Sequence, residues 1–565
     1  MTRFVALASD YDGTLAHDGA VSQETLQALE SFRQTGRKII LVSGRVLSDL
    51  ETVFNRFDLF DCIVAENGGV LYIPATKEKR ALAPPPKKQF IDALQKRRVN
   101  NLGVGDTIVA TWHPHETEVL EVIRDLGLEL HVIFNKGAVM VLPSGVNKKS
   151  GLQAALDSLC LSEHNVVGVG DAENDHAFLE YCECSVAVAN ALEAVKQTAD
   201  FTTHSDHGGG VAELIHMIVN GDLDCPGRRA IPIGTEGNRP VSVPPFGSSL
   251  LVGGTSGSGK STFVAGWLET LSEQKYQFCL IDPEGDYESL PNTVLLGDEK
   301  NAPSVDQVIQ ALQKPTAQVV VNLMSVPLGD RPKFLDTLLP RLLEMRARIG
   351  RPHWIVVDEA HHMLPPNWTL PSAEIPGGLQ NMVLITVHPE HIAPTALRAV
   401  DTVLAMGKEP ASVFEAFANT LGVSSRQQQA MELPTGELLS WFLSTGQTHR
   451  LKFRLAQAER RRHRRNYAIG ELGPENSFYF RGPHDTLNLR AQNLSTFLQL
   501  AEGIDDETWN YHLSRGDYSR WFREAIKDDE LADDAAQYER PDALSPRESR
   551  EGIKGAVERR YTAPA

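Results

Sequence analysis

Short apolar runs that end in acidic, hydroxyl or glycine residues recur along the first third of the chain. Residues 4–8 (FVALA) are followed by Asp10 and Asp12, and the run KIILV is followed by Ser43 and Gly44. A run of this length predicts a buried strand whose carboxyl end carries the polar residues. Because alternate residues of a strand face the same way, Asp10 and Asp12 are predicted to point into one site.

The same pattern continues farther along the chain. The segment NVVGVGDAEND carries Asp171 and Asp175 behind an apolar run, and SGVNKKSGL predicts a helix that begins at Lys148 and Lys149. The order along the chain is therefore an acid pair, a hydroxyl, a lysine and a second acid pair. These strands and helices are interpreted as part of an α/β multidomain protein.

Two carboxylates so close together fit the hydrolysis of a phosphate ester through a covalent intermediate. One carboxylate can attack phosphorus, while its neighbour protonates the leaving alkoxide and then deprotonates the attacking water. The attack meets repulsion of roughly 4 kcal/mol for unit charges 4 Å apart at an effective dielectric near 20. Mg²⁺ and a lysine would offset this repulsion. An isolated acid pair is also compatible with a solvated turn.

Four segments, DYDGTL, VSGR, GVNK and GDAEND, together with AENGGVLY at 65–72, resemble the haloacid dehalogenase (HAD) superfamily. The resemblance is to its Cof-type phosphatases, in which a cap is inserted between the second and third motifs. It covers residues 1–224 and implies a Rossmann-like core with an α+β cap at about 80–140.

The HAD resemblance also implies roles for individual residues. Asp10 would be the nucleophile and Asp12 the general acid and base. Lys148, favoured over Lys149, would neutralise the phosphoryl oxygens. The implied phosphate-binding residues are Ser43 and Gly44, and the implied Mg²⁺ ligands are Asp10, the backbone carbonyl of Asp12, Asp171 and Asp175.

The inserted segment is predicted to select the substrate. PPPKKQFIDALQKRRVNNLG and ETEVLEVIRDLGLELHVI predict two helices with strands around them. An insert of this small size implies a compact phosphate ester, with sugar phosphates among the candidates. His113 and His115 are compatible with ligands and with surface loop residues.

A second phosphate-binding device follows a Pro- and Gly-rich break at 225–247. The segment SLLVGGTSGSGKSTFVAGWLETL predicts a strand, a glycine-rich loop and an amphipathic helix, which is the context of a P-loop. Backbone N–H groups would surround the β-phosphate, Lys260 would reach the β and γ oxygens, and Ser261 would contact Mg²⁺. The predicted ATP-binding residues are Gly254, Thr255, Ser256, Gly257, Ser258, Gly259, Lys260, Ser261, Thr262 and His388.

A P-loop needs a second acid on a neighbouring strand, and HWIVVDEAHHMLP supplies it. Asp358 would hold the Mg²⁺ water shell, and Glu359 would polarise the attacking water. With DPEGDY and ITVHP, these segments resemble the HerA/FtsK-type ATPases, a RecA-like group, over roughly residues 230–455 of a domain predicted at 225–455. His388 stands where that family more often has glutamine. Arg398 is compatible with an arginine finger and with a surface arginine.

The remainder, 456–565, predicts a small helical module with a loosely ordered tail of about twenty residues. The basic run ERRRHRRN at 459–466 is compatible with a phosphate-backbone contact and with a solvated linker helix. Helical spacing favours Trp509, Trp521 and Phe522 as core residues over a base-stacking platform.

Composition narrows the class of protein. The chain has 565 residues, of which 42% are hydrophobic and 23% charged, as in soluble multidomain proteins. A net charge of −18 argues against a general DNA-coating protein. The lack of a long apolar window and the six scattered cysteines favour the cytoplasm. Cys182 and Cys184 are compatible with half of a zinc site and with buried structural thiols.

Together these features predict an enzyme with two activities, which uses Mg²⁺ and ATP. The first is a phosphatase acting through an aspartyl phosphate on a small phosphorylated metabolite, and the second is an ATPase that regulates or assembles it. The alternative hypothesis is a nucleic-acid translocase whose HAD module acts on phosphate ends. The HerA/FtsK resemblance implies a homo-oligomer, with a hexameric ring as the expected form, and no membrane partner is expected.

Overall fold

The chain forms two compact units in the computed structural model. One unit comprises residues 1–261, 267–288 and 292–453, and the other comprises 262–266, 289–291 and 454–565. The residues that the structure describes are 3–135, 137–223, 225, 229–255, 257–369, 378–423, 432–456, 472, 477–483, 487–526, 528–539 and 544–561. Ser256 and the basic run at 459–466 lie outside them.

The first sheet of the larger unit has eight strands, in the order β12-β11-β10-β1-β2-β3-β4-β5. All neighbours from β12 to β3 are parallel, and β4 and β5 continue the sheet as antiparallel strands. The strands are β1 Ala6–Ser9, β2 Lys38–Val42, β3 Cys62–Ala65, β4 Val70–Ile73, β5 Glu78–Ala81, β10 Val166–Gly170, β11 Cys184–Ala187 and β12 Phe201–Thr202. The helices are α1 Gln23–Gln34, α2 Leu47–Val53, α5 Lys148–Leu159, α6 His176–Tyr181, α7 Glu193–Thr198 and α8 His207–Asn220.

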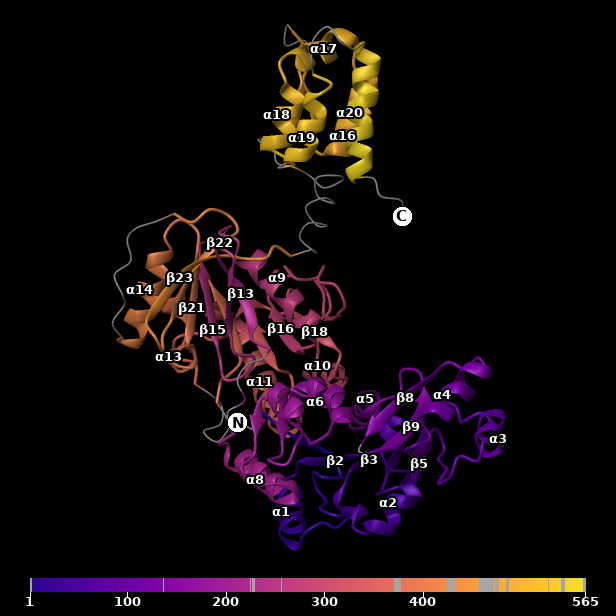
Figure 1. The fold of residues 1–565 in the computed structure, drawn as a ribbon. Coiled ribbons are helices and arrows are strands. Elements are labelled where there is room, and N and C mark those ends of the chain that lie inside the picture. The colour runs from indigo at the N-terminus through magenta and orange to yellow at the C-terminus, as the bar shows by residue number, and fades with distance from the viewer. Residues whose placement is uncertain are drawn as a thin grey trace. The chain divides into compact units, whose positions relative to one another are not determined.

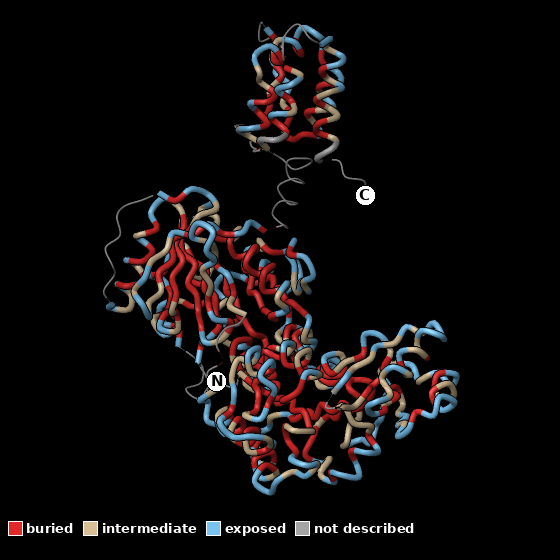
Figure 2. Tube along the Cα trace, viewed as in Figure 1, coloured by how far each residue is buried: buried red, intermediate tan, exposed pale blue. Residues whose placement is uncertain are grey.

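The central strands of this sheet are continuous apolar runs because they are parallel and covered on both faces. Every residue of β1, β3, β10 and β11 is buried. Figure 2 shows this core in red across the sheet. Polar residues that serve a site must therefore lie just beyond the carboxyl ends of these strands.

A smaller α+β module is inserted between β5 and α5. Its four strands run in the order β6-β7-β9-β8. Its elements are α3 Lys88–Lys96, β6 Gly103–Val104, β7 Val109–Trp112, α4 Glu116–Asp125, β8 Leu130–Asn135 and β9 Ala138–Pro143. The sequence predicted one helix across ETEVLEVIRDLGLELHVI, but the helix ends at Asp125. Gly127 adopts a φ of +58°, which terminates the helix, and the following apolar residues pair as β8.

The second sheet has eleven strands, in the order β14-β13-β23-β22-β21-β15-β20-β19-β16-β18-β17. The stretch from β21 to β17 is parallel, and β22, β23, β13 and β14 extend it as antiparallel strands (Figure 1). The strands are β13 Ile231–Glu236, β14 Arg239–Val243, β15 Leu250–Gly254, β16 Phe278–Asp282, β17 Thr293–Leu296, β18 Gln318–Asn322, β19 Trp354–Val357, β20 Met382–Thr386, β21 Thr402–Met406, β22 Glu437–Phe442 and β23 Gln447–Lys452. The helices are α9 Lys260–Glu273, α10 Val305–Leu312, α11 Arg331–Ile349, α12 Ala360–Met363, α13 Pro394–Leu397 and α14 Pro410–Leu421.

Buried polar side chains join the two sheets of the larger unit. Glu183 receives hydrogen bonds from Tyr276 Oη at 3.2 Å and pairs with Arg3 at 3.1 Å and His164 Nδ1 at 2.7 Å. The guanidinium of Arg3 also lies over the ring of Phe246, 4.6 Å from its centroid. We refer to these contacts as the intersheet cluster, which consists of Arg3, His164, Asn165, Glu183, Phe246, Tyr276 and His353.

The hydrogen bonds of His353 fix its neutral tautomer within this cluster. The backbone N–H of Gln277 donates to Nδ1 at 2.7 Å, so Nε2 carries the proton and donates to Asn165 Oδ1 at 3.1 Å. Burial, and then the positive groups at His164, Arg351 and Arg346, hold the pKa of His353 well below its ordinary value. A second proton would have to replace the hydrogen bond from Gln277.

We expect this unit to lose stability as the pH falls below about 6.5, partly through His353. An unfolded histidine takes up a proton near that pH, whereas folded His353 does not, so stability falls as pH falls, by up to about 1.4 kcal/mol per pH unit per group. His353→Gln should show a shallower decline between pH 7 and pH 5, measured by urea unfolding. Parallel declines in the two proteins would contradict this assignment.

The smaller unit is mainly helical. Its elements are β24 Phe478–Phe480, β25 Leu489–Ala491, α16 Leu494–Gly503, α17 Asp506–Ser514, α18 Asp517–Glu524, α19 Asp529–Ala536 and α20 Pro546–Tyr561. Trp509, Trp521 and Phe522 are buried in its core, as the sequence predicted.

The end of the chain differs from the expected loosely ordered tail. Residues 546–561 form helix α20, and only 562–565 lie outside the described residues. Ile553, Ala556 and Val557 follow helical spacing and are almost fully buried in the core of this unit. The many charged residues between them concealed this apolar face.

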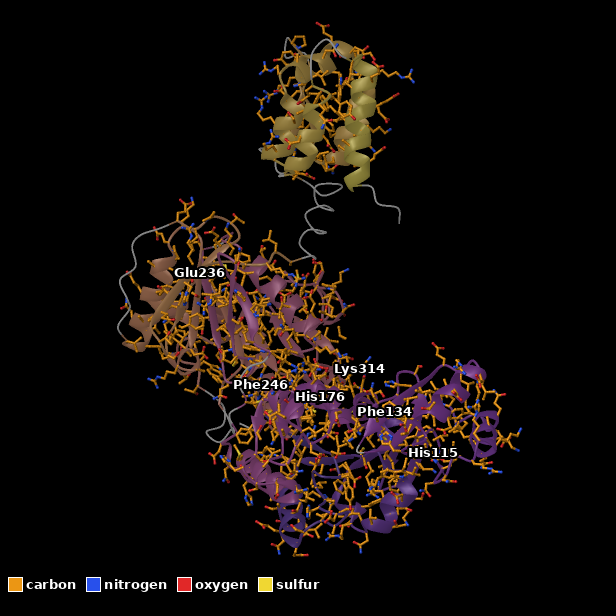
Figure 3. The ribbon with its side chains drawn as sticks, viewed as in Figure 1. His115, Phe134, His176, Glu236, Phe246 and Lys314 are labelled. Atoms are coloured by element: carbon orange, nitrogen blue, oxygen red, sulfur yellow. The ribbon has the colours of Figure 1, made fainter. Side chains whose placement is uncertain are left out.

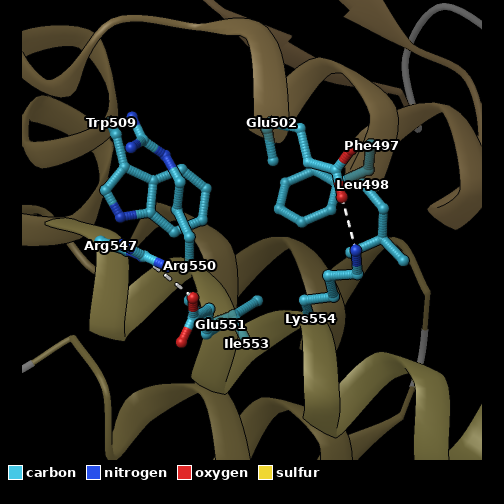
Figure 4. A pocket seen from close by; sticks show the side chains of 10 residues that line it. Phe497, Leu498, Glu502, Trp509, Arg547, Arg550, Glu551, Ile553 and Lys554 are labelled. Atoms are coloured by element: carbon cyan, nitrogen blue, oxygen red, sulfur yellow. Dashed lines mark hydrogen bonds and ion pairs between the residues drawn. The ribbon is translucent and has the colours of Figure 1, made fainter.

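A pocket of about 310 Å³ lies between α16, α17 and α20 (Figure 4). Trp509 and Phe497 contribute aromatic surface to it. Arg547 pairs with Glu551, and Lys554 of α20 pairs across the pocket with a glutamate of α16. These four charges are therefore compensated within the pocket.

In the described part of the chain, no helix is both long enough and apolar enough to cross a membrane.

Candidate functional site

Three buried carboxylates meet at the carboxyl end of the first sheet. β1 and β10 are parallel neighbours, so the residues that follow them, Asp10 and Asp171, lie side by side. Asp175 lies in the turn after β10, where its Oδ2 accepts the backbone N–H groups of Asp171 and Ala172 at 2.9 Å. Carboxylate oxygens of Asp10, Asp171 and Asp175 all lie within 4.8 Å of one another. We call these three residues the acid cluster.

Lys148 neutralises part of the acid cluster. It is the first residue of α5, whose preceding residue Asn147 caps the helix through a hydrogen bond from Ser150 N. Its Nζ lies 2.6 Å from Asp10 Oδ1 and 2.5 Å from Asp175 Oδ1, and the residue is 1% exposed. Lys149 is exposed, with its Nζ 5.6 Å from the ring centre of Tyr181, so the structure brings Lys148 and not Lys149 to the cluster.

The charges of this cluster do not balance. Burial, reinforced by Asp175 and opposed by Lys148, raises the pKa of Asp10 well above its ordinary value. For Lys148 burial acts to lower the pKa, but the carboxylates of Asp10 and Asp175 outweigh it, so the ammonium stays charged. Full ionisation of the three carboxyl groups beside one ammonium would leave an excess of negative charge, which a divalent cation would compensate.

Asp12 lies beside Arg45, which belongs to the loop after β2 that also carries Ser43 and Gly44. Its carboxylate forms a two-pronged ion pair with Arg45, with Nε to Oδ2 at 2.7 Å and Nη2 to Oδ1 at 2.8 Å. Arg45 also binds Asp49 at 2.8 Å. The Asp12 side chain is 40% exposed, whereas the acid cluster is buried.

The residues after β2 lie beside this cluster, where the inserted module approaches. Ser43 is fully buried, and its Oγ accepts the backbone N–H of Arg45 at 3.2 Å. A Cβ atom at Gly44 would lie 3.6 Å from Met140 Sδ and 3.8 Å from Asn174 Nδ2. The backbone at Gly44 is therefore close to both the insert and the loop after β10.

Two asparagines near the acid cluster received no role from the sequence. Asn174 Nδ2 donates to Asn67 Oδ1 at 3.2 Å. Within the described residues, Asn67 Nδ2 and Asn174 Oδ1 are buried without a hydrogen-bond partner. An unpaired buried amide is costly, so such groups mark a position where a polar ligand would bind. The AENGG and GDAEND segments contained both residues, but only their spatial proximity distinguishes them.

Glu66 ties the inserted module to the core, which sequence analysis also missed. Its carboxylate is fully buried and accepts the backbone N–H groups of Asp106, Thr107 and Ile108 at 2.9, 2.7 and 3.2 Å. A Cβ at Gly105 would lie 2.5 Å from Glu66 Oε1, so the close approach requires glycine. Glu66 thereby fixes the register between the module and the core.

A small cluster of buried apolar side chains lies at the insert, and its Met140 comes close to Gly44. Its buried members are Ile108, Met140, Leu142 and Val146. By contrast, His113 and His115 lie away from the acid cluster: His113 Nδ1 pairs with Glu116 at 2.9 Å, and His115 Nε2 accepts the backbone N–H of Asn100 at 3.2 Å (Figure 3).

The P-loop occupies the carboxyl end of β15, as the sequence predicted for the strand, loop and helix. Gly259 has a φ of +95° directly before α9, and a Cβ at Gly254 would lie 2.6 Å from Met406 O. Lys260 Nζ donates to the carbonyl oxygens of Gly254 and Thr255 at 2.9 and 3.1 Å. Ser261 Oγ donates to Asp286 Oδ2 at 3.1 Å. Thr262 follows in α9, and Gly257 and Ser258 lie in the loop.

The predicted acids lie next to the P-loop at the end of β19. Burial raises the pKa of Asp358 well above its ordinary value, and burial and Glu284, opposed by Lys260, also raise the pKa of Glu359. Glu359 has a φ of +43°, and its backbone N–H donates to Asp358 Oδ1 at 2.9 Å. A carboxylate with a raised pKa beside a P-loop suits a general base.

His388 lies beyond β20, where its backbone N–H donates to Thr386 Oγ1 at 2.9 Å. Its ring contacts that of His361, with centroids 5.6 Å apart. His361 Nδ1 in turn lies 3.2 Å from Glu359 Oε2.

Arg398 is exposed at the end of α13. Cys182 and Cys184 are both buried, and Cys184 groups with Asp200 and Cys225 rather than with Cys182.

The two sites belong to two classes of enzyme. The first is a phosphatase with a cluster of aspartates, and the second is a P-loop ATPase. Residues 7–121 and 116–215 match the haloacid dehalogenase-like hydrolases, and residues 238–338 match the central domain of helicase HerA. A phosphoglycolate phosphatase from Methanothermobacter thermautotrophicus is 32% identical over 223 residues, which cover 38% of this chain and 98% of that protein. The chain belongs to the haloacid dehalogenase-like hydrolases and carries a HerA-type domain behind the hydrolase part.

Other proteins match a similar share of the chain. The 5-amino-6-(5-phospho-D-ribitylamino)uracil phosphatase of Bacillus subtilis is 23% identical over 262 residues, covering 38% of this chain and 97% of that protein. A crystal structure of a haloacid dehalogenase-like hydrolase from Bacteroides thetaiotaomicron has 19% identity and a TM-score of 0.34, with 38% of this chain and 99% of that chain covered.

Proposed function

We propose that the chain is a Mg²⁺-dependent phosphomonoesterase acting through an aspartyl phosphate on Asp10, and that its ATPase part regulates it. The observation that carries this proposal is the buried acid cluster with one lysine. The proposed parts are the phosphatase at 1–224 with a cap at 80–140, the ATPase at 225–455 and the helical module at 456–565. We place the protein in the cytoplasm.

The acid cluster suits Mg²⁺, because hard oxygen ligands in excess of local positive charge favour this ion. Asp10, Asp171, Asp175 and the backbone carbonyl of Asp12 would hold it. When bound, it would neutralise the phosphoryl oxygens and so favour attack by a carboxylate.

In the proposed reaction Asp12 acts first as a general acid and then as a general base. Asp10 attacks phosphorus, the ester P–O bond breaks, and Asp12 donates a proton to the departing alkoxide. Asp12 then removes a proton from water, which attacks the aspartyl phosphate and releases inorganic phosphate. Arg45 pairs with both carboxylate oxygens of Asp12, so one of these two contacts must open when Asp12 carries the proton. Lys148 holds Asp10 in place and contributes positive charge.

The transferred phosphoryl group would lie between the strand ends and the insert. Ser43 and the backbone at Gly44 would bind its oxygens, and the unpaired amide groups of Asn67 and Asn174 would complete the polar contacts. The insert approaches the site closely, since a Cβ at Gly44 would lie 3.6 Å from Met140 Sδ, so we expect it to leave room for a small substrate. A compact ester fits this arrangement, and phosphoglycolate, named in the relative from Methanothermobacter, is the first substrate to test.

In the second site Lys260 and the loop around Gly257 would bind the β- and γ-phosphates of ATP. Ser261 and Asp358 would serve its Mg²⁺, Glu359 would act as general base, and His388 would face the γ-phosphate.

The intersheet cluster supports coupling between the sites. We expect saturating ATP to change phosphatase turnover in the full chain by about fivefold or more, within the usual range of allosteric coupling. Lys260→Ala should abolish the response without changing phosphatase turnover in the absence of ATP. Tyr276→Phe, which removes the hydrogen bonds to Glu183, should weaken the response. Equal turnover with and without bound ATP would refute the regulatory role.

The HerA match favours a second candidate, a nucleic-acid translocase whose phosphatase acts on phosphate ends. DNA-stimulated ATP hydrolysis that declines steeply with salt would support it. We also propose a homo-oligomeric ring in which exposed Arg398 reaches a neighbouring ATP site. Molecular mass in solution with and without Mg²⁺ and ATP tests this assembly.

A further inference from the structure

A turn rich in histidine follows β20, beside the ATPase site. Pro389–His391 form a single 3₁₀ turn in which His391 N donates to His388 O at 3.1 Å. His388 precedes this turn and His391 ends it, so the turn brings their two side chains together. Their ring centroids lie 5.0 Å apart, with an angle of 32° between the planes.

A carboxylate completes this group of side chains. Glu390 Oε1 lies 3.0 Å from His388 Nδ1. One ligand atom from each of His388, Glu390 and His391 can be chosen so that all three lie within 4.8 Å of one another. All three residues are exposed, so water has access to a further coordination position.

The donor set indicates the class of ion. Two imidazoles and one carboxylate with an open position are a known ligand set for Zn²⁺, with bonds of about 2.0–2.2 Å. Those bond lengths require ligand atoms roughly 3.4 Å apart, so small side-chain rotations on the exposed turn would suffice. Mg²⁺ prefers oxygen ligands, so the ion that accompanies ATP would not compete for two imidazoles.

The turn is connected to the proposed general base of the ATPase. The ring of His388 packs edge-on against His361, at an angle of 80°. His361 Nδ1 contacts Thr386 Oγ1 at 3.1 Å and Glu359 Oε2 at 3.2 Å. A change in the orientation of the His388 ring can therefore reach Glu359 through one intermediate residue, His361.

We propose that His388, Glu390 and His391 bind Zn²⁺ or a similar transition-metal dication, and that the bound ion slows ATP hydrolysis. An imidazole that coordinates a metal cannot at the same time face the γ-phosphate of ATP. Occupancy of this site would therefore hold His388 away from the nucleotide while leaving the P-loop unchanged.

Binding is tested first, in the full chain without nucleotide. After chelator treatment, equilibrium dialysis against Zn²⁺ should show one equivalent more in the wild type than in His391→Ala, and Glu390→Gln should weaken binding by about tenfold or more. His113→Ala is a matched control, because His113 also pairs with a glutamate but has no second imidazole in its pair. It should bind zinc like the wild type. Equal zinc content in the wild type and His391→Ala would refute the site.

Co²⁺ provides a spectroscopic readout that does not depend on activity. Wild type loaded with Co²⁺ should show visible absorption of nitrogen and oxygen ligation that is lost in His391→Ala. A thiolate charge-transfer band that persists in His391→Ala would instead place the ion at Cys184 and Cys225, which would count against the turn.

Regulation is tested by the rate of ATP hydrolysis at excess Mg²⁺ with free Zn²⁺ set by a metal buffer. Wild type and His113→Ala should slow by at least fivefold, whereas His391→Ala should keep its metal-free rate. Equal inhibition of all three proteins would refute the regulatory part. Binding without inhibition would also refute that part and leave the metal site standing.

Discussion

Replacing Asp10 by asparagine is expected to lower phosphatase turnover by at least about 10⁴-fold, because removing a covalent nucleophile has effects of this size or larger. The amide has the same shape and can still accept a hydrogen bond from Lys148, so the fold should persist. Turnover of phosphoglycolate and a panel of small phosphate esters, with release of inorganic phosphate, is the measurement. ³²P-labelled substrate should label the wild type but not the variant.

The ATPase rate serves as the internal control for Asp10→Asn. It should stay within about twofold of the wild type, because Asp10 belongs to the other sheet. A variant that still released phosphate at the wild-type rate would remove Asp10 from the mechanism. Loss of both activities would indicate a folding defect, which urea unfolding of Asp10→Asn and the wild type side by side would reveal.

Glu359→Gln is expected to slow ATP hydrolysis by about 10²–10⁴-fold while ATP still binds, since a general base contributes a factor of this order. The phosphate-binding loop and Lys260 are unchanged in this variant. Hydrolysis is followed by phosphate release, and binding by a fluorescent ATP analogue. Lys260→Ala is the matched control, because it should lose binding as well as hydrolysis.

The same variant tests the direction of coupling. If ATP binding alone changes the phosphatase, the Glu359→Gln protein with ATP should keep the phosphatase turnover that the wild type shows when ATP is bound. A Glu359→Gln protein that hydrolyses ATP at the wild-type rate would contradict the role given to Glu359.

Sequence patterns placed the residues that lie directly at strand and helix ends. Asp10 follows β1, Asp171 follows β10, and Lys148 begins α5. The P-loop lies between β15 and α9. Such positions are predictable because a buried strand or a helix start fixes where the next polar residue lies.

Contacts between distant segments were not predictable. Arg45 binds Asp12 across 33 residues, and Glu66 reaches Thr107 across 41. Both depend on how the strand order brings loops together, which no local pattern encodes. Helix α20 was missed because charged residues separate its few apolar positions, and the basic run at 459–466 and Ser256 lie outside the described residues.

The intersheet cluster has a consequence for the history of the gene. His353 receives one hydrogen bond from its own sheet and donates the other to Asn165 of the first sheet, and Glu183 is satisfied in part by Tyr276 of the second. Cutting the coding sequence between the two halves would leave these groups unmatched on both products. A mutation that separated the phosphatase part from the ATPase part would therefore weaken both. Selection for either activity then favours keeping the two parts in one reading frame.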